Sequence, residues 1–325
     1  MRVFITKLFI YLGLIAVFLG LYLLLIYNRP DLVDDFYYRF TTPKAHSLIL
    51  GGSLAGQGIH PDIINTQLDL GENHIINHAF AVGPSSYGPN YLKEITKKLK
   101  KGSADGLFII SVSPWTLGKD NENDDSTQFF EVERKLFVGN LKSSSLNPNL
   151  EYLIHHWNNK FEPFVRLYKY FTNYQGIAIL HSNGWLEVIA KMDSISNNER
   201  IKRSLESSKY NTFSLSNTRL LYLDKIISYV DKFGEVIIIR MPVTRQMADL
   251  EKTRYPEFDT IIQGIADKNN VHYFNFMGLS GQFLTVDAYH LYKKDGEKFT
   301  NLLCDSINKY LNSVNQHDIL VQNIE

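Results

Sequence analysis

The chain begins with an uninterrupted apolar stretch. Residues 8–27 carry no charged side chain, and roughly 20 apolar residues are enough to cross a bilayer as a helix. Arg2 and Lys7 precede the stretch and several aspartates follow it, so the positive charge places the N-terminus in the cytoplasm. A cleaved signal peptide is the alternative, but its apolar core is shorter and ends in small residues, whereas bulky residues here continue to Tyr27. The pattern favours an uncleaved, single-pass anchor in the cytoplasmic membrane, with the remaining chain outside.

Beyond this anchor, short apolar runs alternate with longer amphipathic stretches. The runs are bounded by turn or charged residues and predict strands at residues 47–50, 75–77, 107–112, 236–239 and 271–274. The stretches predict helices at residues 91–101, 218–233, 246–268 and 295–311. Such alternation is typical of parallel strands joined by crossover helices, so we expect an α/β fold with helices on both faces of one sheet. Ligands of such sheets bind beyond the C-terminal ends of the strands.

The alternation is interrupted between residues 119 and 216. This segment starts with the polar residues 119–128 and then becomes rich in aromatic side chains. It predicts a solvated loop followed by a helical insertion whose aromatic residues mainly pack together. An insertion beside an active-site face is also where a lid or an acceptor-binding surface would form. The other predicted parts are a cytoplasmic stub at 1–7, a linker at 28–44, a domain at 45–312 that carries the insertion, and a flexible tail at 313–325.

Composition excludes several classes of protein. The chain has 34 basic and 34 acidic residues and a formal net charge of zero, so we expect no binding of nucleic acid. Cys304 is the only cysteine, which rules out an intrachain disulfide and a thiolate metal site, and its apolar setting predicts a core position in a helix. His155, His156 and His272 have no companion acids at metal-binding spacing. We therefore expect neither a metal nor another cofactor.

Two motifs far apart in the sequence carry candidate chemistry. Ser53 lies in Gly-Gly-Ser-Leu-Ala-Gly directly after the first predicted strand, and Asp287 and His290 lie in Asp-Ala-Tyr-His-Leu before the last predicted helix. A serine hydroxyl needs an imidazole to take its proton and a carboxylate to orient that imidazole. A glycine-rich turn could instead hold a phosphate, but the lysine of a P-loop is missing and the glycines do not fit dinucleotide-binding spacing. The motifs together therefore predict a nucleophile and its base.

These motifs resemble the SGNH/GDSL hydrolase superfamily. A further similarity is Asn-His-Ala-Phe-Ala-Val-Gly after the second predicted strand. The resemblance covers most of residues 45–312 apart from the insertion. It implies a flavodoxin-like, three-layer α/β/α sandwich in which Ser53 is the nucleophile, His290 the general base and Asp287 the orienting carboxylate.

Two other segments are similar to membrane-anchored members of that superfamily. They are Val-Ser-Pro-Trp at 112–115 and Ile-Ile-Ile-Arg-Met-Pro-Val at 237–243. The members concerned take part in teichoic-acid D-alanylation and exopolysaccharide O-acetylation. Arg240, in the second segment, is either a salt-bridge partner or a group that reaches the substrate, because strand-end charges gather at the functional edge of such sheets.

The sequence departs from the superfamily at two places. The usual Gly-Asp-Ser is Gly-Gly-Ser, and the third strand ends in Ser-Val-Ser-Pro-Trp without the asparagine that helps to bind the oxyanion. The oxyanion would then rest on the backbone N–H groups of Ser53 or Leu54 and of Gly83, helped by the hydroxyls of Ser113 or Ser85. Loss of one donor typically costs about 10² to 10³ in rate, which suits a slow, dedicated transferase.

The resemblance implies a membrane-anchored, extracytoplasmic serine esterase or O-acyltransferase. Its substrate would be an acylated, above all acetylated, carbohydrate of the cell envelope or an exported polysaccharide. Its expected partner is a membrane-bound O-acyltransferase, and residues 8–27 would contact the membrane. The missing asparagine keeps open an alternative, a catalytically inactive scaffold that binds glycan or an envelope-assembly partner.

Overall fold

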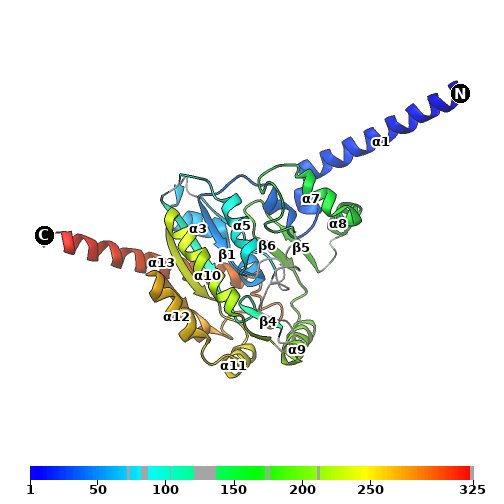
Figure 1. Ribbon diagram of the computed structural model, residues 1–325. Helices are drawn as coiled ribbons and strands as arrows, with labels where there is room; N and C mark the ends of the chain where they lie inside the picture. Colours follow the sequence, from blue (N-terminus) through cyan, green and yellow to red (C-terminus); the bar gives the residue numbers. More distant parts are fainter. Residues whose placement is uncertain are drawn as a thin grey trace.

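A parallel sheet forms the centre of the protein (Figure 1). The computed structural model describes residues 1–71, 74–81, 87–102, 104–120, 137–172, 174, 176–210 and 213–322. Within these residues the central sheet has five strands, β1 (Ser47–Leu50), β2 (Ile75–Asn77), β3 (Gly106–Ser111), β8 (Gly234–Arg240) and β9 (His272–Asn275). All neighbouring strands are parallel, in the order β2-β1-β3-β8-β9. This is the flavodoxin-like order, and the predicted α/β fold class is confirmed.

Both faces of the sheet are buried, because successive side chains of a strand point to opposite sides. Leu48 and Phe108 belong to one apolar cluster, while Ile49 and Ile109 belong to the other. The first cluster packs under α5 (Pro89–Lys98), α10 (Asn217–Val230) and α12 (Phe258–Asn269). The second packs under α2 (Ser53–Gly58), α3 (Pro61–Gln67), α11 (Arg245–Arg254) and α13 (Lys293–Gln322). The result is three layers, helices on each side of the sheet (Figure 1).

Two helix boundaries differ from the prediction. The single helix expected at 246–268 is wrong, since α11 ends at Arg254 and α12 begins at Phe258. Pro256 lies between them, and a proline disfavours the helical conformation of the residue before it, here Tyr255 with φ −128° and ψ 59°. The last helix, α13, continues to Gln322 and so includes most of the expected flexible tail.

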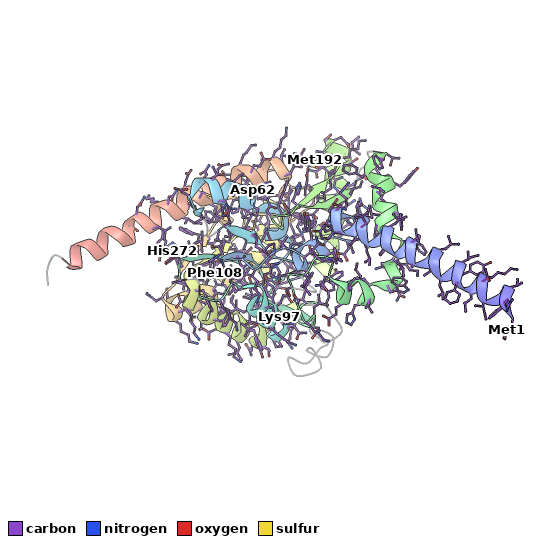
Figure 2. All side chains as sticks on the ribbon, turned by 90° about the horizontal axis from the view of Figure 1, so that it is seen from above. Met1, Asp62, Lys97, Phe108, Met192 and His272 are labelled. Atoms are coloured by element: carbon purple, nitrogen blue, oxygen red, sulfur yellow. The ribbon has the colours of Figure 1, made fainter. Side chains whose placement is uncertain are left out.

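The N-terminal helix α1 (Arg2–Asn28) projects away from the body (Figure 1), and Figure 2 shows Met1 at its far tip and Phe108 within the body. α1 is long and apolar enough to cross a membrane. The predicted linker that follows it packs against the body. Its short helices η1 (Pro30–Leu32) and η2 (Tyr37–Phe40) place Tyr37 and Phe40 in the core with no exposed surface. The chain therefore passes from α1 directly into the body.

The insertion contains strands as well as helices. The described helices are α7 (Leu150–His155), η4 (Trp157–Asn159), α8 (Glu162–Phe171) and α9 (Ser194–Tyr210). The strands form two antiparallel pairs, β4 (Gly118–Asp120) with β7 (Phe213–Leu215) and β5 (Ile177–Leu180) with β6 (Leu186–Ile189). Residues 121–136, which include most of the expected solvated loop, lie outside the described part.

The aromatic residues of the insertion do not mainly pack together as expected. Tyr152 is fully buried, and Trp185 is partly buried. The following described side chains are instead exposed: Trp157, Phe161, Phe164, Tyr168, Tyr170, Phe171 and Tyr174. Their exposure needs a separate explanation, because a contiguous apolar surface is unusual on a protein surrounded by water.

Candidate active site

Ser53 is the first residue of α2 and follows β1 at the C-terminal edge of the sheet. Gly51 and Gly52 form the turn between the two elements. Gly51 has φ 139°, and a Cβ atom there would lie 2.8 Å from the carbonyl oxygen of Ser111 on β3. A glycine is therefore required for the chain to pass this close to the neighbouring strand. The turn places the Ser53 hydroxyl at the edge where ligands of such sheets bind.

The structure brings Ser53, His290 and Asp287 together. The Nε2 atom of His290 lies 2.8 Å from Ser53 Oγ, and its Nδ1 atom lies 2.8 Å from Asp287 Oδ2. The side chains of His290 and Asp287 are 17% and 25% exposed, so a ligand can reach them. This arrangement of hydroxyl, imidazole and carboxylate is the one that activates a serine nucleophile.

The loop that carries Asp287 is held by its own backbone. Asp287 Oδ1 accepts hydrogen bonds from the N–H groups of Tyr289 at 2.8 Å and His290 at 2.9 Å. Burial alone would raise the pKa of the Asp287 carboxyl, but the His290 ring and these backbone donors lower that pKa to about 2. Asp287 is therefore ionised and oriented to accept a hydrogen bond from the Nδ1–H group of His290.

A buried tyrosine joins the turns that follow β1 and β2. The Tyr91 hydroxyl accepts a hydrogen bond from the Gly51 N–H at 3.0 Å and donates one to the His78 carbonyl oxygen at 3.0 Å. Burial raises the pKa of Tyr91 above its ordinary value, which keeps the hydroxyl proton in place. Tyr91 thus connects the turn before Ser53 to the segment after β2, and no sequence motif singled it out.

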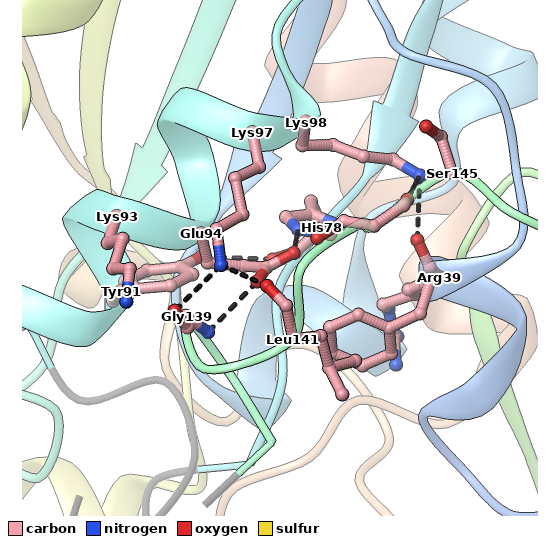
Figure 3. Close-up of polar contacts among 12 residues, drawn as sticks. Arg39, His78, Tyr91, Lys93, Glu94, Lys97, Lys98, Gly139, Leu141 and Ser145 are labelled. Atoms are coloured by element: carbon pink, nitrogen blue, oxygen red, sulfur yellow. Dashed lines mark hydrogen bonds and ion pairs between the residues drawn. The ribbon is translucent and has the colours of Figure 1, made fainter. Parts of the chain in front are cut away.

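Other polar side chains of α5 and its surroundings contact one another near Tyr91 (Figure 3). His78 Nε2 lies 3.4 Å from Glu94 Oε1, and both side chains are fully buried. Lys98 Nζ donates to the carbonyl oxygens of Arg39 at 2.7 Å and Ser144 at 2.9 Å. The Lys98 bonds connect α5 to the segment after α1 and to the insertion.

The predicted oxyanion donors differ in what the structure shows of them. Leu54 is the second residue of α2, and the N–H groups of a first helical turn have no acceptor within the helix. Gly83 and Ser85 lie outside the described residues. Ser113 is buried in a turn, where its Oγ atom accepts from the Thr116 N–H at 3.3 Å. Of the candidates that the structure describes, Ser53 and Leu54 both have backbone N–H groups in the first turn of α2.

Arg240 is paired inside the protein. Its guanidinium donates to Glu251 Oε2 and to Asp259 Oδ1, each at 2.7 Å, and its side chain is 6% exposed. Trp115 Nε1 donates to the other oxygen of Glu251 at 2.9 Å. Because both ends of the guanidinium are occupied by carboxylates, the salt-bridge alternative describes this residue. Its prediction as a substrate-binding group is corrected accordingly.

A cavity of about 390 Å³ opens beside Asp287 and His290. Gln57, Lys191 and Arg200 contribute polar groups to its lining. Arg200, from α9, donates through Nε to the Val286 carbonyl oxygen at 2.6 Å and through Nη2 to the Lys191 carbonyl oxygen at 2.7 Å. The insertion therefore builds one wall of the cavity and braces the loop of the acid. No local pattern around Arg200 indicates this role, since it depends on contacts distant in sequence.

The insertion also contacts α2, the helix that begins at Ser53. Trp185, between β5 and β6, donates through Nε1 to the Gln57 carbonyl oxygen in α2 at 2.8 Å, and its ring lies 4.1 Å from that of His60. Nearby, the Asn183 carbonyl oxygen accepts from the Asn77 N–H at the end of β2 at 2.8 Å. The β5–β6 pair therefore covers the edge of the sheet next to Ser53.

Comparison with known proteins gives little beyond these contacts. No protein-family model matches the chain, and neither does any curated protein. The inhibitor-bound aryl esterase of M. smegmatis aligns with 81% of this chain and 99% of its own, at 10% identity and a TM-score of 0.35. Est24, a carbohydrate acetylesterase from Sinorhizobium meliloti, aligns over the same shares at 12% identity and a TM-score of 0.35. Likeness at this level assigns no activity to the chain.

Proposed function

We propose that the protein is a membrane-anchored serine enzyme of the SGNH type that acts on acyl esters. One observation carries this proposal. The Ser53 hydroxyl, the two nitrogens of His290 and the Asp287 carboxylate form one hydrogen-bonded line, with 2.8 Å at each step, beside an open cavity. A purely structural role for Ser53 and His290 does not explain their alignment with a carboxylate at the edge of the sheet where ligands bind.

The proposed reaction follows from that line of atoms. His290 Nε2 takes the Ser53 proton as Oγ attacks the ester carbonyl carbon, and Asp287 stabilises the imidazolium that forms. The oxyanion lies against the Leu54 N–H, with the Gly83 N–H as a second donor. His290 then gives its proton to the departing alkoxide, which leaves an acyl-enzyme on Ser53. Attack by water releases an acid, whereas attack by a sugar hydroxyl transfers the acyl group.

The proposed substrate is an acetylated carbohydrate of the envelope or an exported polysaccharide. The charges around α1 favour a position of the body on the outer side of the cytoplasmic membrane, because positive residues precede the apolar stretch and acidic residues follow it. The Gln57, Lys191 and Arg200 groups beside the triad can hydrogen-bond to sugar hydroxyls. A membrane-bound O-acyltransferase is the partner that we propose for supplying acyl groups.

A second candidate is a glycan-binding scaffold without catalysis. One observation favours it: the end of β3 has Ser113 in place of an asparagine, and the Ser113 hydroxyl is engaged with Thr116. The two candidates differ in what Ser53 does. A scaffold would retain its binding of acetylated glycan and its biological effect in the Ser53→Ala variant, whereas an enzyme would lose the effect.

Hydrolysis of p-nitrophenyl acetate by the full-length protein in detergent tests the proposal. We expect measurable release of p-nitrophenol from wild type and its loss in Ser53→Ala. The matched control is Ser228→Ala, because Ser228 lies on the exposed side of α10 away from the triad. Equal activity in wild type and Ser53→Ala would show that Ser53 is not the nucleophile.

A further inference from the structure

Exposed apolar side chains lie beside the C-terminal end of α1, where it enters the body. They lie on α7, η4 and α8, and the most exposed include Ile154, Trp157, Phe161, Tyr168 and Phe171. Figure 1 shows α7 and α8 beside the place where α1 enters the body. Contacts confirm this proximity, since Asn147 Nδ2 donates to the Tyr27 carbonyl oxygen at 3.2 Å. We call residues 146–174 the α7–α8 segment.

The orientation of α8 is the reverse of that of an ordinary surface helix, which buries its apolar face. Arg166 points to the body, where its Nη2 donates to Asp35 Oδ1 at 2.8 Å. Phe164, Tyr168 and Phe171 follow one another at helical spacing and are 39%, 70% and 75% exposed. The polar side chain thus faces the protein and the aromatic side faces outward. An exposed apolar face of this kind is typical of a surface that contacts a partner or a membrane.

The same segment lies along part of the apolar stretch of α1. The Phe164 ring lies 6.1 Å from that of Tyr22, and a groove of about 390 Å³ runs between α1 and the segment. Its α1 wall extends from Leu14 to Tyr22. At 1.5 Å per residue, this wall covers about 12 Å of the helix. If residues 8–27 span a bilayer, Leu14 to Tyr22 lie around the middle of that span, so the groove and the opposite wall, with Trp157 and Phe161, lie within the hydrocarbon layer and extend into its outer half.

We propose that the α7–α8 segment is a second membrane-contacting element, with its aromatic face in the outer leaflet and a lipid acyl chain in the groove. Three observations favour lipid as the occupant. The face is continuous with the apolar surface of α1, it is rich in Trp, Tyr and Phe as membrane interfaces are, and Lys160 stands over the Trp157 and Phe161 rings. The Lys160 ammonium is paired with the faces of these two rings, and its apolar stem can lie along the apolar surface beside them.

This inference goes beyond the proposed function because it concerns how the body sits on the membrane. A helix joined to a domain by a flexible linker lets the domain turn freely. Here the residues after α1 are packed, and the α7–α8 segment adds a second contact beside the first. Two contacts fix the tilt of the body and hence the height of the triad above the bilayer.

Spin labels on single cysteines of the full-length chain in lipid nanodiscs test the inference. Phe161→Cys and Phe171→Cys report on the segment, and Leu14→Cys reports on α1. Leu221→Cys, on the exposed side of α10, is the matched control in water. Cys304 is buried, and its contribution is measured with the labelled parent chain. Collisions with oxygen, which concentrates in lipid, are compared with those of a nickel chelate, which stays in water.

We expect labels at residues 14, 161 and 171 to collide more with oxygen than with the chelate, and the label at 221 to show the opposite. A label at 14 in lipid with labels at 161 and 171 in water would overturn the inference and leave the anchor intact. Shielding of residues 161 and 171 from both reagents would also overturn it, because a second copy or another protein would then cover the face. Quenching of tryptophan emission by brominated lipid should in addition be reduced in Trp157→Phe and retained in Trp185→Phe.

Discussion

His290 Nε2 lies 2.8 Å from the hydroxyl of Ser53, although 237 positions of sequence separate the two residues. The sheet explains this proximity. Ser53 follows the first strand of the chain, and the loop of His290 follows the last strand and precedes α13, which packs against α2. Both loops leave the same edge of the sheet. The contact therefore depends on the arrangement of the whole sheet. Substitutions of Ser53 and of His290 test the same hydrogen bond.

Variants of the triad should not act independently. We expect Ser53→Ala and His290→Ala to abolish ester hydrolysis, and the double variant to be no slower than either. Asp287→Asn should retain more activity than either, with a kcat loss of up to about 10⁴, because the imidazole remains but loses its orienting charge. Steady-state kinetics on p-nitrophenyl acetate measures all four. Additive losses in the double variant would mean that the two residues do not work as one unit.

Removal of the Tyr91 hydroxyl should loosen the nucleophile turn. Tyr91→Phe removes the hydroxyl that accepts from the Gly51 N–H and donates to the His78 carbonyl oxygen, which should lower the free energy of unfolding by about 1 to 3 kcal/mol and reduce kcat more than it raises KM. Tyr152→Phe is the matched control, because Tyr152 is equally buried and its hydroxyl donates to Asp34 far from the turn. Equal effects of both variants on kcat would contradict a positioning role for Tyr91.

Arg240 should matter for stability and little for the reaction. Arg240→Met leaves the buried Glu251 carboxylate without its partner, and breaking such a pair typically costs about 3 to 5 kcal/mol. We expect a large fall in the denaturation midpoint and an unchanged KM for the remaining folded protein. A raised KM together with normal stability would restore the interpretation of Arg240 as a substrate-binding group.

Acid should destabilise the protein through His60. Burial lowers the pKa of His60 from 6.5 to about 4, so the unfolded chain takes up a proton at this residue before the folded chain does. The free energy of unfolding should therefore fall as the pH drops from about 6.5 to 4, with no further loss from this group below that range. His60→Phe keeps a ring against Trp185 and should make the fall shallower in urea titrations. The same substitution at the exposed His155 should leave the slope as in wild type.

The sequence predicts the strands of the sheet and the three residues of the triad, because local patterns mark each of them. Apolar runs that end in small or polar residues mark the strands, and Ser53, Asp287 and His290 stand in motifs at loop positions. The partners of Arg240 could not be predicted in this way. Glu251 and Asp259 lie 11 and 19 positions further along two helices, and only the crossover of those helices brings them to the strand end.

The exposed aromatic residues show a different limit of the pattern. Tyr152 and Phe171 are both aromatic residues in helices of the insertion, yet Tyr152 is buried and Phe171 is 75% exposed. An apolar periodicity indicates which side of a helix avoids water, but it does not distinguish a protein core from a membrane. Pro256, in contrast, was a visible signal for the break between α11 and α12.

Labelling with a fluorophosphonate probe, read by intact mass on the full-length protein, tests the activation of Ser53 most directly. The probe phosphonylates a serine whose proton is taken by a neighbouring base. We expect one adduct on the wild type and none on Ser53→Ala or His290→Ala, with labelling of Ser228→Ala unchanged. A folded wild type that takes no adduct, or an adduct that persists in Ser53→Ala, would contradict an activated serine at this position.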